Sequence, residues 1–143
     1  MIPDIEANGG MRILIVDDDR DVAATYRPLL EPAGYTVIAA HSVREALDLL
    51  DEQRDVRLVI SDVRMPGVDG LDLVRVLRHR FPELPAILFT GASLTDDDIV
   101  PRGAVVMRKP VAIEELKRTI AQTLHSVTTK ARALAVAKSG DRA

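Results

Sequence analysis

The sequence LVISDVRMPGVDG, from Leu58 to Gly70, decides how the rest of the chain is interpreted. Its first residues are apolar, as in a buried strand, and Asp62 stands at the carboxyl end of that strand. Pro66, Gly67 and Gly70 then break the chain before a new apolar period begins. In open parallel sheets, ligands bind at the carboxyl ends of the strands. The stretch therefore predicts a strand that presents Asp62 as a reactive carboxylate.

Composition limits the class of protein. The chain has 143 residues, a length that fits one domain, and 47% of them are hydrophobic, enough for a core. It contains no cysteine, which excludes a disulfide framework and thiolate metal ligands and suits a reducing cytoplasm. No apolar run approaches the roughly 18 residues of a membrane span, and the net charge of −3 lacks the basic footprint of a nucleic-acid binder. We therefore expect a cytoplasmic protein that binds neither a membrane nor nucleic acid directly.

Apolar, β-branched runs alternate with helical periods along the chain. We expect strands at residues 12–16, 35–40, 58–62, 86–89 and 104–107. We expect helices at residues 22–33, 43–50 and 71–81, a short one near 95–99 and a long one at 113–134. Such alternation implies right-handed crossovers and helices on both faces of a parallel sheet. The expected fold is α/β: a single doubly wound five-stranded parallel sheet in the flavodoxin-like order 2-1-3-4-5, with a short fourth helix and a long C-terminal helix.

The same pattern divides the chain into three parts. Residues 1–10 are expected to form a flexible tail, residues 11–126 the folded domain, and residues 127–143 an extension of the last helix with a tail. The extension suits a dimer seam, a stub toward a further domain or a frayed helix end, because two extra turns do not establish a coiled coil. Pro101 shortens the fourth helix, since the residue before a proline is pushed out of the helical region.

Chemically capable side chains stand at the ends of four expected strands. They are Asp17 and Asp18, Asp62, Thr90 and Lys109. Three close carboxylates repel one another, and a hard divalent cation such as Mg2+ (or Mn2+) relieves that repulsion. Lys109 and Thr90 suit a ligand that brings further negative charge, such as a phosphoryl group. Asp62 can then act as the nucleophile and form an aspartyl phosphate.

Each of these residues also has a plainer interpretation. Asp17 and Asp18 could only cap a helix, and Asp62 could be a solvated turn acid. Thr90 could bond to nearby backbone, and Lys109 could be a surface lysine. Their convergence at one predicted sheet edge favours a functional site.

Neighbouring polar residues receive structural interpretations. Asp19 and Asp21 are expected to cap and open the first helix. Ser42 and Glu45 have the spacing of a capping box at the start of the second helix. Three histidines stand on separated segments and are interpreted as surface residues: His41, His79 and His125.

Four motifs, taken in order, resemble the receiver domain of two-component response regulators. They are ILIVDDD, LVISDVRMPGVDG, ILFTG and RKP, and they lie between about Arg12 and Leu124. The resemblance implies that residues 11–126 form a receiver domain with Asp62 as its phosphoacceptor. The donor would be the phosphohistidine of a sensor histidine kinase or of a histidine phosphotransfer protein. The domain would be a signalling module rather than an enzyme, catalysing only its own phosphorylation and dephosphorylation.

The resemblance also implies roles for the other strand-end residues. The implied Mg2+ ligands are Asp18, Asp62 and the backbone carbonyl of Arg64, with Asp17 holding the ion directly or through water. The implied phosphoryl contacts are Thr90 and Lys109, followed by a cis peptide bond between Lys109 and Pro110.

The chain departs from the family at its switch position. The family usually carries Tyr or Phe three residues before the lysine, where this chain has Val106. A valine cannot follow the state of Thr90 by swinging in and out as the aromatic does. Together with the short fourth helix, Val106 implies an atypical output surface.

Two other functions stay open at this point. One is an aspartyl phosphatase of the haloacid-dehalogenase type, with Asp17 as its nucleophile and Asp19 two residues later. That hypothesis leaves LVISDVRMPGVDG unexplained. The other is a degenerate receiver that serves only as a binding scaffold.

The expected output is a binding event. No helix-turn-helix, nucleotide-cyclase or ATPase region follows Leu134. The effector would therefore be another protein, a second copy of this chain in a homodimer, or a domain outside this sequence. The surface expected to bind this effector is formed by the fifth strand, the last helix and the remainder of the fourth helix.

Overall fold

A computed structural model describes residues 11–65, 68–91 and 101–125. They fall in two compact units, one that extends to Val111 and one that begins at Ala112. The first unit contains the sheet and the helices that cover it, and in the second a helix occupies residues 113–125. The expected tail at 1–10, the short helix near 95–99 and the extension at 127–143 lie outside the described residues.

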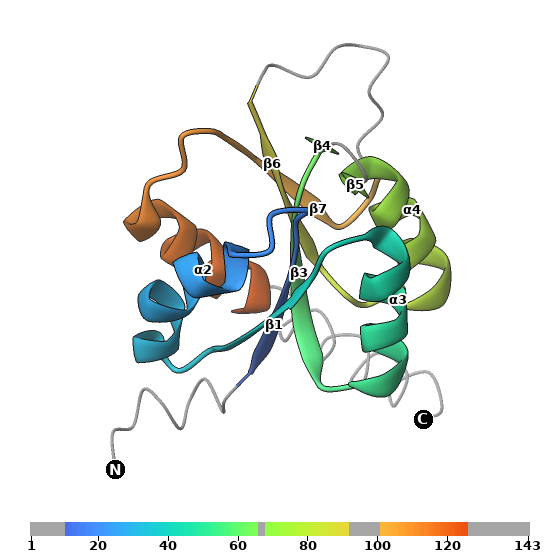
Figure 1. The fold of residues 1–143 in the computed structure, drawn as a ribbon, viewed down its shortest axis with the longest axis horizontal. Coiled ribbons are helices and arrows are strands. Elements are labelled where there is room, and N and C mark those ends of the chain that lie inside the picture. Colours follow the sequence, from blue (N-terminus) through green and yellow to red (C-terminus); the bar gives the residue numbers. More distant parts are fainter. Residues whose placement is uncertain (1–10, 66–67, 92–100, 126–143) are drawn as a thin grey trace, which may run out of the picture. The chain divides into compact units, whose positions relative to one another are not determined.

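The sheet has five parallel strands in the order β2-β1-β3-β6-β7, which confirms the flavodoxin-like order expected from the sequence (Figure 1). The central strand β3 pairs with β1 on one side and with β6 on the other. It therefore carries its last residue, Asp62, to the middle of the carboxyl edge. The strands are β1 (Arg12–Val16), β2 (Thr36–Ala40), β3 (Val56–Asp62), β6 (Ala86–Thr90) and β7 (Ala104–Arg108).

Helices cover both faces of this sheet. Helix α2 (Val22–Leu30) lies on one face, and α3 (Val43–Glu52) and α4 (Gly70–Arg80) lie on the other (Figure 1). Between β3 and α4, the two-residue strands β4 (Arg64–Met65) and β5 (Val68–Asp69) pair antiparallel, where the sequence predicted a loop.

The first helix ends earlier than predicted. Its expected last turn forms the 3-10 helix η1 (Glu31–Ala33) instead. Pro32 has no N–H to continue the α-helical bonding, and Gly34 then ends the turn with a left-handed φ of 100°. Pro28 lies inside α2, as the sequence predicts.

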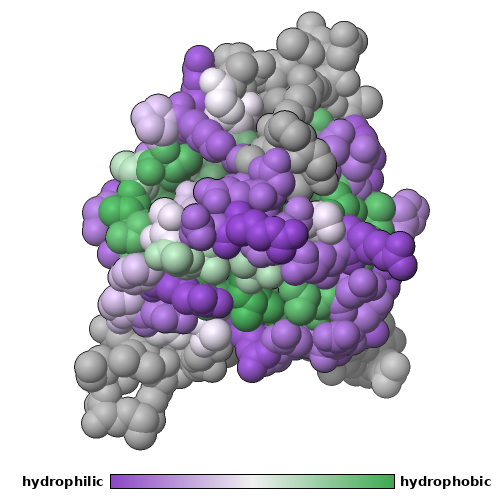
Figure 2. Space-filling model, in the orientation of Figure 1, coloured by the Kyte–Doolittle hydropathy of each residue, from purple (hydrophilic) through white to green (hydrophobic). Residues whose placement is uncertain are grey.

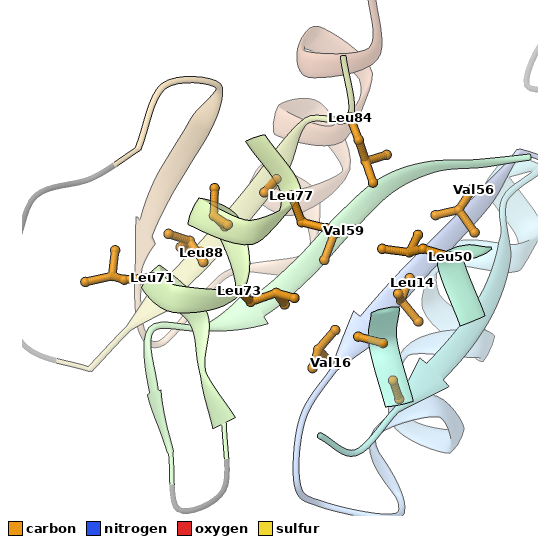
Figure 3. Packing of buried hydrophobic residues seen from close by; sticks show 14 of the residues in the cluster. Leu14, Val16, Leu50, Val56, Val59, Leu71, Leu73, Leu77, Leu84 and Leu88 are labelled. Carbon is orange, nitrogen blue, oxygen red and sulfur yellow. The ribbon is translucent and has the colours of Figure 1, made fainter. Parts of the chain in front are cut away.

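Alternate strand residues supply a core on each face. Leu14, Val59 and Leu88 point toward α3 and α4, where they meet Leu50 and Leu77 (Figure 3). All five are buried. Side chains alternate along a strand, so the intervening residues face α2, and among them Ile13, Ile15 and Ile60 are also buried. This two-sided burial explains why the strands read as continuous apolar runs rather than as alternating ones.

The exterior of the described residues is predominantly hydrophilic on the face shown in Figure 2, where hydrophobic residues form separate patches. Among the helices that the structure describes, none is both long and apolar enough to cross a membrane.

Candidate functional site at the carboxyl edge of the sheet

Asp62 is a buried carboxylate that has only one paired oxygen. The residue is 5% exposed. Lys109, just past β7, places its Nζ 2.8 Å from Asp62 Oδ1. The second oxygen, Oδ2, is buried and has no hydrogen-bond partner among the residues that the structure describes. Because an unpaired buried carboxylate oxygen is unfavourable, Asp62 is preorganised to accept a further ligand at Oδ2.

Asp17 and Asp18 follow β1, the neighbour of β3. The Asp17 N–H donates to the carbonyl of Ala40 at 3.0 Å, and Asp17 Oδ1 accepts from the Asp19 N–H at 2.9 Å. Burial raises the pKa of Asp17, the bond from Asp19 opposes that rise, and the charges of Asp62 and Asp18 add to it. The strand ends therefore bring these carboxylates close enough to repel one another, as the sequence predicts.

The next two acids, Asp19 and Asp21, lie in successive turns before α2. The helix cap that the sequence predicted at Asp21 is wrong. Asp19 Oδ1 accepts from the Asp21 N–H at 2.9 Å. Asp21 occupies the N-cap position of α2, but its side chain makes no cap hydrogen bond. Its φ of −97° and ψ of 4° lie outside the extended region that aims an N-cap side chain at the first helical N–H groups.

Thr90 lies beside Lys109 at the same edge. It ends β6, and its carbonyl accepts from the Lys109 N–H at 2.8 Å. The peptide bond between Lys109 and Pro110 is cis, which confirms the expectation from the sequence. The structure therefore brings Thr90, Lys109 and Asp62 to one edge, and their catalytic roles stay predictions.

Arg64 and Val106 occupy the positions implied by the resemblance. Arg64 opens β4 two residues past Asp62, where its backbone pairs with Asp69. Val106 lies opposite Leu88 in the register of β6 and β7 and is 36% exposed. Neither a ligand role for the Arg64 carbonyl nor a switch role for Val106 follows from these positions alone.

Gly70 holds the start of α4 against the end of β3. Its N–H donates to the Val63 carbonyl at 2.8 Å. A Cβ at position 70 would lie 2.2 Å from the carbonyl oxygen of Asp62, a distance that no side chain can adopt. Asp69 caps the helix, since its Oδ1 accepts from the N–H groups of Leu71 and Asp72. Asp69 and Gly70 therefore fix where α4 begins after β3.

His41 is a residue whose position the sequence interpretation missed. It is partly buried, and its Nδ1 lies 3.0 Å from the backbone carbonyl oxygen of Asp17. His41 is therefore a partly buried residue at the surface, and the sequence interpretation did not foresee the contact of its ring. The available signal was its place directly after β2, where it stands at the same carboxyl edge as the acids of β1.

Tyr26 also lies within reach of the site. Its ring centroid is 6.4 Å from that of Phe89, the residue opposite Asp62 in the sheet register. Burial raises the pKa of Tyr26, and the charges of Asp62 and Asp17 raise it further. The phenol therefore lies within the electrostatic field of the carboxylates.

The donor groups at this edge suit a cation bound mainly by oxygen. Within the described ranges, no three His, Cys, Asp or Glu side chains converge as a ready-made metal cage. Mg2+ does not need such a cage, because it binds through one or two carboxylates and retains several waters. The crowded Asp17 fits such an ion, because a cation beside it would relieve the repulsion from Asp62 and Asp18.

Comparison with known proteins identifies a related family. A family model described as the response regulator receiver domain matches residues 13–121. The response regulator MprA of Mycobacterium avium (strain 104) is 40% identical over 109 residues, which cover 74% of this chain and 47% of MprA. The transcriptional regulatory protein CpxR of Escherichia coli (strain K12) is 39% identical over 101 residues, covering 64% of this chain and 42% of CpxR. The chain thus spans about half the length of the curated relatives it matches.

Solved structures show the same fold. A CheY-like receiver domain protein from Methanospirillum hungatei JF-1 superposes with a TM-score of 0.75 at 27% identity, covering 83% of this chain and 97% of that protein. The response regulator TrrA of Thermotoga maritima, crystallised in complex with Mg2+ and BeF, has a TM-score of 0.69 at 29% identity. That match covers 78% of this chain and 97% of TrrA.

Proposed function

Because the chain belongs to the response-regulator receiver family, we propose that it is the phosphoacceptor of a two-component or phosphorelay system and that Asp62 takes the phosphoryl group. One observation carries this proposal: Asp62 is buried at the carboxyl edge, with Oδ1 paired to Lys109 and with no partner for Oδ2 within the described ranges. A carboxylate nucleophile needs an oxygen that no fixed donor occupies. Oδ2 attacks phosphorus while the P–N bond of the donor phosphohistidine breaks, and the electron pair of that bond stays on the imidazole, which leaves as a neutral ring because its other nitrogen already carries a proton.

A divalent cation, Mg2+ or Mn2+, is the proposed cofactor. When bound, it supplies positive charge that neutralises the phosphoryl oxygens. The raised pKa of Asp17 supports a cation at this place, because an ion relieves the repulsion among the neighbouring carboxylates. The groups that would hold it are Asp17, Asp18, Asp62 and the backbone carbonyl of Arg64.

Lys109 and Thr90 complete the proposed charge balance. The Lys109 ammonium already lies at the nucleophile and can follow a phosphoryl oxygen once Asp62 is esterified. The Thr90 hydroxyl would donate to a second phosphoryl oxygen. Val106 offers no aromatic ring to follow Thr90, so we propose that the output of this chain relies on other groups.

Phosphorylation by a small-molecule donor tests the proposal. The full chain is incubated with acetyl phosphate and MgCl2, and its intact mass is measured. We expect one added phosphoryl group on the unmodified chain and none on Asp62→Asn. Asp72→Asn, which removes an exposed acid from α4, serves as a matched control and is expected to be phosphorylated normally. An unmodified chain that never gains mass would overturn the proposal and leave the scaffold hypothesis.

The position of Lys109 separates this function from the phosphatase hypothesis. Between the two candidate nucleophiles, Lys109 forms its ion pair with Asp62 and forms none with Asp17. In the receiver hypothesis, Asp17→Asn weakens cation binding but leaves the nucleophile in place. In the phosphatase hypothesis, Asp17→Asn abolishes covalent phosphorylation and Asp62→Asn does not. The mass measurement on these two variants therefore distinguishes the hypotheses.

The proposed partners follow from the reaction. A sensor histidine kinase or a histidine phosphotransfer protein in the cytoplasm donates the phosphoryl group, and an effector protein or a second copy of this chain responds. A panel of purified kinases identifies the donor by the rate of phosphotransfer. Size-exclusion chromatography with and without beryllofluoride, a phosphoryl mimic, tests self-association. An earlier elution with the mimic supports a homodimer, and an unchanged profile supports a different effector protein.

A further inference from the structure

His41 connects the second strand to the acidic loop after the first. Both backbone groups of Asp17 bond to consecutive residues there: its N–H donates to the Ala40 carbonyl, and its carbonyl oxygen lies 3.0 Å from His41 Nδ1. A carbonyl can only accept, so Nδ1 must carry the proton and donate. This contact fixes the ring as the Nδ1–H tautomer whenever the imidazole is neutral.

The His41 residue is itself held in place by the start of α3. Its backbone N–H donates to Glu45 Oε2 at 3.1 Å, and the Glu45 N–H donates to Ser42 Oγ at 3.1 Å. The predicted capping box is thus half formed: Ser42 caps Glu45, but the Glu45 carboxylate binds the residue before the cap. The helix start therefore fixes the backbone from which the imidazole reaches Asp17.

Holding the Asp17 carbonyl restrains the backbone that carries both acids of the β1 loop. The peptide that joins Asp17 to Asp18 is planar, so holding its oxygen sets the orientation of the whole unit. The Asp17 side chain is tied separately through the Asp19 N–H. Without such ties, carboxylates that repel one another would move apart, and a cation would have to draw them together again.

We propose that His41 is a positioning residue for the divalent cation, acting through the peptide between Asp17 and Asp18. This inference rests on the proposed function, because it assigns a purpose to the acids as cation ligands. The imidazole touches neither the cation nor the phosphoryl group. It lowers the reorganisation needed for binding, as groups that orient metal ligands do in general.

Two isosteric variants separate this role from a merely structural one. Asn places its amide nitrogen at the same bond distance from the backbone as His Nδ1 and can donate to the Asp17 carbonyl. Leu has the same shape as Asn but has no donor. We measure Mg2+ affinity of the full chain by isothermal titration calorimetry, and thermal unfolding without metal by circular dichroism.

We expect His41→Leu to weaken Mg2+ binding by about tenfold, the lower end of the loss seen when an orienting partner is removed. His41→Asn is expected to stay within about threefold of the unmodified chain, on the same basis. Equal Mg2+ affinity of Leu and the unmodified chain would overturn the inference, and so would equal loss in Asn and Leu. If His41→Leu does not fold, His41→Ala, which also lacks a donor, replaces it under the same criteria.

The outcome for His41 is distinguishable from the outcome for the proposed function. If the unmodified chain binds Mg2+ and accepts a phosphoryl group, and His41→Leu binds Mg2+ with the same affinity, only the role of His41 is refuted. An unmodified chain that binds no Mg2+ would overturn both.

Discussion

Lys109 and Asp62 form an ion pair across the carboxyl edge, with Nζ 2.8 Å from Oδ1, although the Asp62 side chain is 4% exposed and that of Lys109 is 46% exposed. Removing the lysine leaves a buried carboxylate without a partner. We expect Lys109→Met to destabilise the metal-free chain by on the order of 1 kcal/mol, less than for a fully buried pair because Lys109 is hydrated. Urea unfolding measures the change.

A double-mutant cycle checks the origin of that loss. In an Asp62→Asn background, Lys109→Met is expected to change the free energy of unfolding little, since no charge remains to be paired. Equal losses in both backgrounds would attribute the effect to packing of the lysine stem.

Gly70 is expected to accept no side chain, because a Cβ would meet the Asp62 carbonyl oxygen at 2.2 Å. We predict that Gly70→Ala destabilises the chain by roughly 1–3 kcal/mol, the range for overpacked positions. Gly91→Ala is the matched control, since a Cβ there meets no described atom within 4 Å. Thermal unfolding of the two variants provides the comparison, and similar midpoints would contradict the assigned contact.

Tyr26 reports the charge of the site. Because burial and then the charge of Asp62 raise its pKa, Asp62→Asn should lower the pKa of Tyr26. The value should stay above the usual 10.0, since the larger cause, burial, remains. The phenol is titrated by ultraviolet absorption in a Tyr35→Phe background, which leaves Tyr26 as the single tyrosine. Asp72→Asn should leave the titration unchanged, and a Tyr26 pKa that ignores Asp62 would refute the placement of the ring.

Asp17 should make stability depend on pH in the acid range. Its pKa in the folded chain lies above the usual 3.8, so the folded state binds more protons between the two values. The contribution of Asp17 is therefore fully present below the unfolded pKa and is lost as pH rises through the folded pKa. Asp17→Asn should gain stability relative to the unmodified chain over that interval when divalent cations are absent.

Denaturant unfolding of both chains across the acid range measures this difference. Asp72→Asn controls for the loss of one negative charge. A constant difference between Asp17→Asn and the unmodified chain at every pH would contradict the expected linkage. Excess MgCl2 should reduce the advantage of the variant near neutral pH.

The residues at the strand ends could be predicted because the buried strands are continuous apolar runs in the sequence. Each apolar run ends in a polar residue, and parallel topology brings Asp17, Asp62 and Thr90 to one edge. His41 was missed because the predicted strand order places β2 beside β1 but does not determine which group a side chain after β2 will contact. The cap at Asp21 was wrong because capping requires backbone angles that residue type alone does not determine.

The position of the site at the carboxyl edge of the sheet couples ligand binding to the stability of the fold. Asp17, Asp62 and Lys109 follow or end β1, β3 and β7, so a ligand that contacts all three binds only the completed sheet. Such a ligand stabilises the folded state by roughly 2.7 kcal/mol at one hundred times its Kd. Ligand binding at this site can then be measured as increased resistance of the sheet to heat or protease. Each phosphorylation at this edge would therefore also change the lifetime of the folded state.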